Sequence, residues 1–262
     1  MEELNFLEEN TLKKKAIIFL HPKNLANWIW SKQLNVFKNY HTIFLDLPNH
    51  GKNKNNSKFT VKETVETLKD FILNLKKEEV NLVGIGLGGQ IAISLISKYP
   101  NLINKTIISG VDVSLKEDKT SYENSIVQVL SDTKEILDNK KEGFLTFAYL
   151  RHFGIKKDYY DDLFNTFKNQ DYENLKRISF ESLNYSLDFN PKNNSKEILL
   201  CFGSYDTIWC KSSAHDIKKL YPNTHIMKID NAVHLWNIRN SKKFNNIILD
   251  YLKSHNKSSL KN

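Results

Sequence analysis

Short apolar runs recur along the chain and are separated by longer stretches with helical periodicity. They occupy residues 16–20, 42–46, 81–85, 106–109, 198–203 and 225–229. A strand with one face in water alternates polar and apolar positions, whereas a strand covered on both faces is apolar throughout. These runs therefore predict the strands of a sheet that is buried on both faces.

Helical patterns fill the gaps between the predicted strands. Residues 88–99 are apolar over most of their length, and two other stretches carry a one-sided apolar stripe. The stripes consist of Val61, Val65, Leu68, Phe71, Ile72 and Leu75, and of Phe244, Ile247, Ile248, Tyr251 and Leu252. Because strands alternate with helices, we expect right-handed crossovers. The predicted fold class is α/β, with a mostly parallel, doubly wound sheet.

Residues 112–190 interrupt this alternation. The segment contains no convincing strand, several helix-like stretches and many aromatic side chains. We interpret it as a helical cap insertion that lies over one end of the sheet, with an apolar cavity beneath it. The core then has two parts, residues 1–111 and 191–255, followed by a polar tail at 256–262 that we expect to be disordered.

The chain is basic, with a net charge of +8 from 38 Lys and Arg against 30 Asp and Glu. Such a balance can indicate nucleic-acid binding, but the only arginines are Arg151, Arg177 and Arg239. Arginine is the residue best suited to bidentate contacts with phosphates and bases. Scattered lysines are typical of a solvated surface, so we expect no nucleic-acid partner.

The sequence gives no sign of a targeting or membrane-spanning segment. It contains no apolar run of about 18 residues, the length a spanning helix needs. Its acidic start at residues 1–4 lacks the basic-then-apolar order of a secretory signal. We therefore expect a cytoplasmic protein without membrane insertion.

The chain has two cysteines, Cys201 and Cys210, too few to suggest a disulfide framework. No spacing of cysteine and histidine residues resembles a zinc site. We therefore expect neither a metal nor a cofactor.

Five short motifs lie near the ends of the predicted strands, and their order is informative. They are Leu20-His21-Pro22, residues 45–52, Gly84-Ile85-Gly86-Leu87-Gly88-Gly89, Gly203-Ser204-Tyr205-Asp206 and Asn231-Ala232-Val233-His234. In this order they resemble the motifs of the α/β-hydrolase fold family of AB hydrolase type. The resemblance covers about residues 15–110 and 191–255 and implies that family's fold.

The resemblance assigns roles to three residues that follow strands. It places Gly86 where the family has its serine nucleophile, at the tip of a sharp strand-to-helix turn. Glycine has no group that could attack a carbonyl, but it tolerates the backbone angles of this turn. By the same resemblance Asp206 is the acid and His234 the general base. Asp112, just after the fourth apolar run, is an alternative acid.

An oxyanion hole is also implied by the resemblance. Its two donors would be the backbone N–H groups of Leu87 and Lys23, which do not depend on the side chain present. His21 and Trp28 belong to the same predicted binding region. Pro22 has no N–H and fixes its own φ, so it can shift the loop that carries the second donor.

These residues predict a protein that binds a small apolar ligand in a degenerate active site, without covalent ester hydrolysis. One alternative is an enzyme that uses His234 and Asp206 on water or substrate, of hydrolase, lyase or cofactor-free oxygenase type. Another nucleophile could replace the serine, with Ser109, Ser204 and Cys210 as candidates. A Ser→Gly trapped variant of a serine esterase and a purely structural role also stay open, as does the oligomeric state.

Overall fold

The structure is a computed structural model that describes residues 4–53, 58–113, 120–190 and 195–254. Its centre is a seven-stranded sheet with the order β1-β3-β2-β4-β5-β6-β7. The strands are β1 (Phe6–Glu9), β2 (Lys15–Leu20), β3 (His41–Leu45), β4 (Glu79–Ile85), β5 (Thr106–Ser109), β6 (Ile198–Gly203) and β7 (Thr224–Ile229). Only β1 runs antiparallel to its neighbour. The predicted mostly parallel sheet is confirmed.

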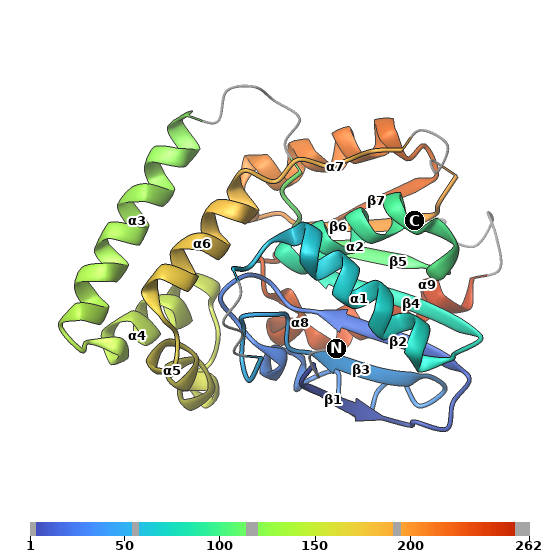
Figure 1. The fold of residues 1–262 in the computed structure, drawn as a ribbon, viewed down its shortest axis with the longest axis horizontal. Helices are drawn as coiled ribbons and strands as arrows, with labels where there is room; N and C mark the ends of the chain where they lie inside the picture. Colours follow the sequence, from blue (N-terminus) through green and yellow to red (C-terminus); the bar gives the residue numbers. More distant parts are fainter. Residues whose placement is uncertain (1–3, 54–57, 114–119, 191–194, 255–262) are drawn as a thin grey trace.

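Parallel pairing brings the carboxyl ends of the strands to one edge of the sheet. Leu20 of β2 pairs with Gly84 of β4, and Ile85 pairs with Ser109 of β5. The loops that leave β2, β4, β5 and β6 therefore start side by side. In Figure 1 this edge faces the group of helices α3 to α6 on the left of the sheet.

Helices cover the sheet on both faces. Side chains of α1 (Val61–Leu75), α2 (Leu87–Lys98) and α7 (Ile208–Leu220) share one apolar cluster with Ile18 and Leu20 of β2. The neighbouring residues Ile17 and Phe19 point into a second cluster with the 3-10 turn η1 (Asn27–Trp30), α8 (Trp236–Arg239) and α9 (Ser241–Lys253). This double burial explains why the strands are apolar throughout.

The first long helix, α1, has clear start and stop signals. The Thr60 hydroxyl accepts a hydrogen bond from the Glu63 N–H at 3.1 Å, and the same hydroxyl donates to the Glu63 carboxylate at 2.9 Å. This Thr-x-x-Glu arrangement satisfies a backbone donor that the helix itself leaves open. At the other end, Lys76 adopts a left-handed conformation with φ 50° and ends the helix.

Within the described part of the insertion, four α-helices form the cap. They are α3 (Thr120–Asp138), α4 (Glu142–Phe153), α5 (Tyr160–Lys168) and α6 (Tyr172–Leu183), with the turn η3 (Lys157–Tyr159) before α5. All lie within the predicted insertion and beyond the carboxyl edge of the sheet (Figure 1). Leu145, Leu150, Leu163 and Phe167 join the cluster around η1, which anchors the cap to the core.

The structure adds elements that the pattern did not predict. The strand β1 carries two glutamates and pairs only with β3 at the sheet edge, so it lacks the apolar signature of the inner strands. Trp28 and Trp30 lie in a single 3-10 turn, and a second such turn, η2 (Pro100–Leu102), follows α2. The predicted tail at 256–262 lies outside the described residues.

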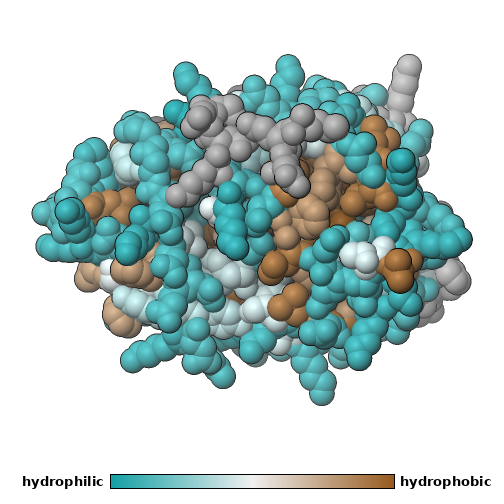
Figure 2. Space-filling model, turned by 60° about the horizontal axis from the view of Figure 1, so that its bottom comes forward, coloured by the Kyte–Doolittle hydropathy of each residue, from teal (hydrophilic) through white to brown (hydrophobic). Residues whose placement is uncertain are grey.

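The surface matches the scattered charges of the sequence. Figure 2 shows hydrophilic side chains over most of one face of the molecule, with apolar side chains in smaller groups between them. Within the described residues, no helix has the length and hydropathy needed to cross a bilayer.

Candidate active site

The turn between β4 and α2 is built around Gly86. This residue has φ 54° and ψ −116°, angles that a side chain makes costly. Its N–H donates to the Ser109 carbonyl at 3.0 Å, and its own carbonyl accepts the N–H of Gln90 at 3.0 Å. A Cβ on Gly84 would overlap the backbone of Gly88, which confirms that small residues let the strand and the helix approach here.

His234 and Asp206 meet beside this turn. Asp206 follows β6, and one of its oxygens accepts the Gly203 N–H at 2.7 Å while the other lies 3.5 Å from Nδ1 of His234. The Asp206 carboxylate is buried and 2% exposed, whereas the His234 side chain is 26% exposed. The imidazole thus has a fixed carboxylate on one nitrogen and partial access to solvent.

Backbone hydrogen bonds between two loops bring the acid and the histidine together. The Tyr205 N–H donates to the Ala232 carbonyl at 3.0 Å, and the Ser204 N–H donates to the Ile229 carbonyl at 2.9 Å. These bonds join the loop after β6 to the loop after β7. Because β6 and β7 are neighbours in the sheet, the pairing extends their contact into the loops.

The position of a side chain on Gly86 can be derived from its backbone. An ideal Cβ there would lie 3.0 Å from His234 Nε2 and 3.2 Å from Pro22 Cβ. Both separations are shorter than usual carbon contacts. His234 Nε2 therefore faces the tip of the turn across a narrow slot, which Pro22 closes on its other side.

Gly110, directly after β5, is a site residue that the sequence analysis missed. Its φ is +56°, and a Cβ there would come within 2.6 Å of His234 Nδ1 and 2.8 Å of Cε1. The imidazole therefore occupies the space that a side chain on residue 110 would need. The sequence feature that could have identified Gly110 is its position directly after the apolar strand that ends at Ser109.

The cap also reaches the histidine. Phe153, the last residue of α4, lies with its ring centroid 6.2 Å from that of His234 at an interplanar angle of 35°. An aromatic ring at this range shields part of the imidazole from water. This contact links the helical insertion to the acid–histidine pair.

The predicted oxyanion donors occupy two different settings. Leu87 is the first residue of α2, where backbone N–H groups have no acceptor within the helix. Lys23 lies in the loop after β2, and its side chain is half-buried. Burial lowers the pKa of the Lys23 ammonium, and the negative charge of Asp112 opposes that shift.

Backbone groups contact both ring nitrogens of His21. Its side chain is fully buried, with Nδ1 2.8 Å from the Pro22 carbonyl and Nε2 accepting the Leu47 N–H at 3.0 Å. A carbonyl can only accept and a backbone N–H can only donate, so the ring is the neutral Nδ1–H tautomer. Burial lowers its pKa to about 4. The ring therefore joins the loop after β2 to the loop after β3.

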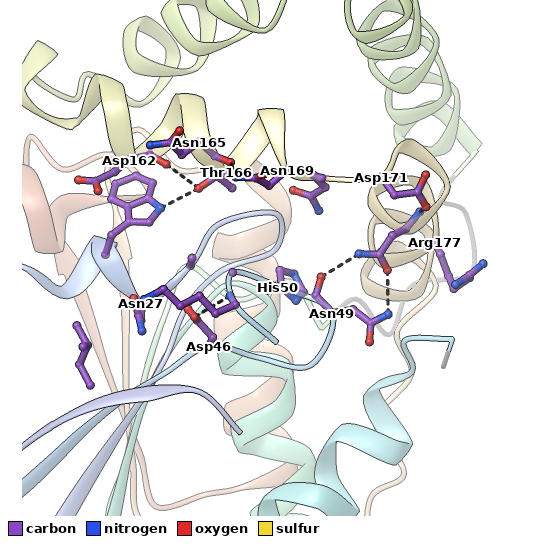
Figure 3. A pocket seen from close by; sticks show the side chains of 17 residues that line it. Asn27, Asp46, Asn49, His50, Asp162, Asn165, Thr166, Asn169, Asp171 and Arg177 are labelled. Carbon is purple, nitrogen blue, oxygen red and sulfur yellow. Dashed lines mark hydrogen bonds between the residues drawn. The ribbon is translucent and has the colours of Figure 1, made fainter. Parts of the chain in front are cut away.

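Trp28 lies apart from His234, in the wall of a cavity of about 700 Å³ beneath the cap. Its indole N–H donates to Thr166 of α5 at 3.1 Å. The lining is mainly polar and comes from η1, the loop after β3, α5 and α6, as Figure 3 shows for its labelled residues. Neither Gly86 nor His234 lines this cavity.

The alternative acid does not pair with the histidine. Among the residues that the structure describes, Asp206 is the carboxylate within ion-pair distance of His234. Asp112 follows β5, and its charge acts on Lys23 and Cys210. The geometry therefore favours Asp206 over Asp112 as the partner of the imidazole.

The candidate replacement nucleophiles are engaged elsewhere. The buried Ser109 hydroxyl accepts from the Trp236 indole at 2.8 Å, and the Ser204 hydroxyl accepts the Asn231 N–H at 3.0 Å. Burial raises the pKa of the Cys210 thiol to about 12, which keeps it protonated and weakly nucleophilic. Within the described residues no three Cys, His, Asp or Glu side chains gather as a metal site would require.

Comparison with known proteins agrees with this architecture. The chain is 33% identical to an AB hydrolase superfamily protein of Gibberella zeae over 76 residues, which span 29% of this chain and 27% of that protein. It is 24% identical to monoacylglycerol lipase ABHD6 of Homo sapiens over 263 residues, covering 93% and 77% of the two chains.

A solved structure extends the likeness to the whole fold. The enol-lactonase from Burkholderia xenovorans LB400 has a TM-score of 0.78 at 14% identity, covering 96% of both chains. The family described as alpha/beta hydrolase fold matches residues 15–241. This chain therefore belongs to the alpha/beta hydrolase fold family.

Proposed function

We propose that this chain binds a small apolar ligand beside Gly86 and does not hydrolyse esters through a covalent intermediate. The observation that carries the proposal is the narrow slot at the turn, where His234 Nε2 faces a residue without a side chain. An imidazole in this place has no hydroxyl to activate. In a related triad geometry, loss of the attacking serine costs about six orders of magnitude in turnover.

Phe153 and the partial exposure of the imidazole support a ligand at this place. The ring provides an apolar wall, and His234 is 26% exposed in an otherwise buried setting. The named relatives are a lipase and a lactonase. Acyl compounds are therefore the first class of ligand to screen.

Covalent labelling tests this proposal. We would offer p-nitrophenyl butyrate and a fluorophosphonate probe to the native chain and to a Gly86→Ser variant. The native chain should show neither a burst of p-nitrophenol nor a labelled residue in intact-mass spectra. Stoichiometric labelling of the native chain would refute the proposal, and labelling of the variant alone would locate the missing group at residue 86.

The pair of His234 and Asp206 favours a second candidate, an enzyme that acts by general base catalysis. Nδ1 faces the carboxylate, so the lone pair on Nε2 points to the slot. The imidazole would take a proton from water as the water oxygen attacks an ester carbonyl. The imidazolium would then return that proton to the departing alkoxide as the C–O bond breaks, which releases the alcohol and the carboxylic acid. General base catalysis of this kind contributes about 10²–10⁴-fold.

Steady turnover without a burst would be the sign of this second mechanism. We would compare the native chain with His234→Ala and with Asp206→Asn on p-nitrophenyl acetate. The mechanism requires that His234→Ala reduce any turnover to background and that Asp206→Asn reduce it partly. Equal rates in all three proteins would eliminate it.

A further inference from the structure

The cavity that Trp28 lines differs in composition from the slot at Gly86. Its volume of about 700 Å³ lies within the range of small-molecule sites, about 300–1,000 Å³. Six of its 17 lining residues carry side-chain amides: Asn27, Asn49, Asn165, Asn169, Gln170 and Asn174. Figure 3 shows labelled side chains of α5 on one side of the cavity, and those of η1 and the loop after β3 on the opposite side. A ligand here would contact cap and core together.

Hydrogen bonds between cap and core hold the two walls of this cavity. The Trp28 indole N–H donates to the Thr166 hydroxyl of α5 at 3.1 Å. Asn174 of α6 exchanges two hydrogen bonds with Asn49 of the loop after β3, at 2.8 and 3.2 Å. Because these bonds join the walls at two places, the cavity is pre-formed, as small-molecule sites usually are.

The charges of the lining nearly cancel. The lining contains three carboxylates and two basic side chains: Asp46, Asp162, Asp171, Lys52 and Arg177. The buried Asp46 carboxylate accepts the N–H groups of Asn27 at 2.7 Å and Lys52 at 3.1 Å. The Asp171 carboxylate accepts the Asn174 N–H at 3.1 Å at the start of α6. Since the backbone already partners two of the three carboxylates, this lining fits a neutral ligand better than a charged one.

Two amides of the lining have open hydrogen-bonding groups. Among the residues that the structure describes, neither the Asn27 amide nor the Asn165 amide has a hydrogen-bond partner. Asn27 precedes Trp28 in the chain and Asn165 precedes Thr166, so the bond between Trp28 and Thr166 brings both amides to one end of the cavity. Each amide can both donate and accept, which is also the capacity of a hydroxyl group.

The indole of Trp28 adds an aromatic surface to this polar lining. Trp28 is half-buried, and its ring centroid lies 5.8 Å from that of Tyr159. The bond to Thr166 and the contact with Tyr159 fix the orientation of the indole. The face of an aromatic ring carries partial negative charge and attracts positively polarised C–H groups. The end of the cavity at Trp28 therefore matches a ligand that has both hydroxyls and a face of C–H groups.

We infer that this cavity binds a neutral saccharide, with one pyranose ring against Trp28 and its hydroxyls bonded to Asn27 and Asn165. A pyranose ring has C–H groups on its faces and hydroxyls along its rim, and each hydroxyl both donates and accepts. The inference goes beyond the proposed function, because neither Gly86 nor His234 lines this cavity.

Isothermal titration calorimetry tests the class of ligand. We would titrate the native chain with maltose, cellobiose and lactose, and with glucose 6-phosphate and uridine for comparison. At least one disaccharide should bind with a stoichiometry of one and a dissociation constant below about 1 mM. It should bind more tightly than the phosphate and the nucleoside.

Three variants test the position of the saccharide. Asn27→Ala removes an amide without a partner among the described residues, so it should fold normally and weaken disaccharide binding about two- to tenfold. Trp28→Ala should weaken binding at least about tenfold, because it removes the aromatic face. Asn184→Ala is the matched control, since it removes an exposed amide at the end of α6 that does not line the cavity. That control should leave the dissociation constant unchanged.

Several outcomes would overturn the inference. One is the absence of binding by all three disaccharides at about 10 mM. Tighter binding of glucose 6-phosphate or of uridine would instead indicate a site for an anion or for a base. Equal dissociation constants for the native chain and Asn27→Ala would place the saccharide elsewhere, even if Trp28→Ala does not fold. Fluorophosphonate labelling concerns only the slot at Gly86, so this inference and the proposed function can fail separately.

Discussion

The corner around His234 and the cavity under α5 are both hollows between cap and core, but they differ in nearly every respect. The cavity holds about 700 Å³ and is lined by amides and charges from four elements. Its histidine, His50, is buried. The corner is a narrow slot between glycine backbone and Pro22, and its histidine is partly exposed.

The difference shows that the volume of a cavity does not indicate whether its side chains can act in proton transfer. His50 uses Nδ1 on the Pro48 carbonyl, and Nε2 is buried without a hydrogen-bond partner among the described residues. Burial and the neighbouring His21 lower its pKa to about 3. His234 instead has one nitrogen near a carboxylate and the other facing Gly86. The smaller hollow holds the groups that can move a proton.

The largest expected effect is on stability at mildly acidic pH. His21 and His50 stay neutral in the folded chain, with pKa values of about 4 and 3. The unfolded chain binds protons at both below its ordinary pKa of about 6.5, so the free energy of unfolding falls as the pH falls. Urea unfolding should show a loss of about 4 kcal/mol between about pH 7 and pH 5.

A variant identifies the histidines as the source of this loss. His21→Gln removes one of the two groups, so the loss over the same range should fall to about 2 kcal/mol. An unchanged pH dependence in His21→Gln would show that His21 is not one of the titrating groups.

The next effect is expected at Gly110. Gly110→Ala combines a positive φ with a Cβ that meets the His234 ring, and it should cost about 3 kcal/mol in urea unfolding. Gly154→Ala is the matched control, because its φ is +61° but its Cβ would meet only the flexible end of Arg239. That control should cost about 1 kcal/mol. Equal costs for both variants would mean that the His234 ring moves away from the added Cβ without loss of stability.

Gly86→Ser should have a smaller effect on stability. The strained angles cost about 1–3 kcal/mol, and His234 or Pro22 must shift by a few tenths of an ångström. Urea unfolding of the native chain and of the variant measures the combined cost of the backbone strain and of this shift. A variant as stable as the native chain would contradict the narrow slot.

The smallest effect is expected on the cavity side. The Asn174 amide donates to the Asn49 carbonyl at 2.8 Å and accepts from the Asn49 amide at 3.2 Å, bonds drawn in Figure 3. Asn174→Ala should cost about 1 kcal/mol of stability, and in a double variant this cost should add to that of Gly110→Ala. A double variant whose cost departs from the sum by more than about 0.5 kcal/mol would break the separation between cavity and corner.

The apolar runs predicted the inner strands because a strand that is buried on both faces is apolar throughout. That pattern is visible in the sequence alone. Ile198–Gly203 forms β6 with the predicted limits. The edge strand β1 was missed because Glu8 and Glu9 face solvent or His41 and Asn35, and only the pairing with β3 defines it. An edge strand depends on its partner more than on its own composition.

The site was only partly accessible to sequence reasoning. Motif order located Gly86, Asp206 and His234, and the structure brings these three together. The polar cavity was missed, since its lining comes from segments far apart in the chain. The burial and contacts of His21 and Lys23 depend on the orientation of each side chain in the loop after β2. The order of the motifs does not predict those orientations.

The narrow slot at Gly86 affects which substitutions residue 86 tolerates during evolution. A single base change can turn a glycine codon into a serine codon, but the new hydroxymethyl group would arrive between an imidazole and a proline ring that already fill the flanks. A serine side chain would therefore cause backbone strain and steric crowding together. A serine at residue 86 therefore costs stability until the neighbouring loop also changes, which disfavours this substitution as a single step.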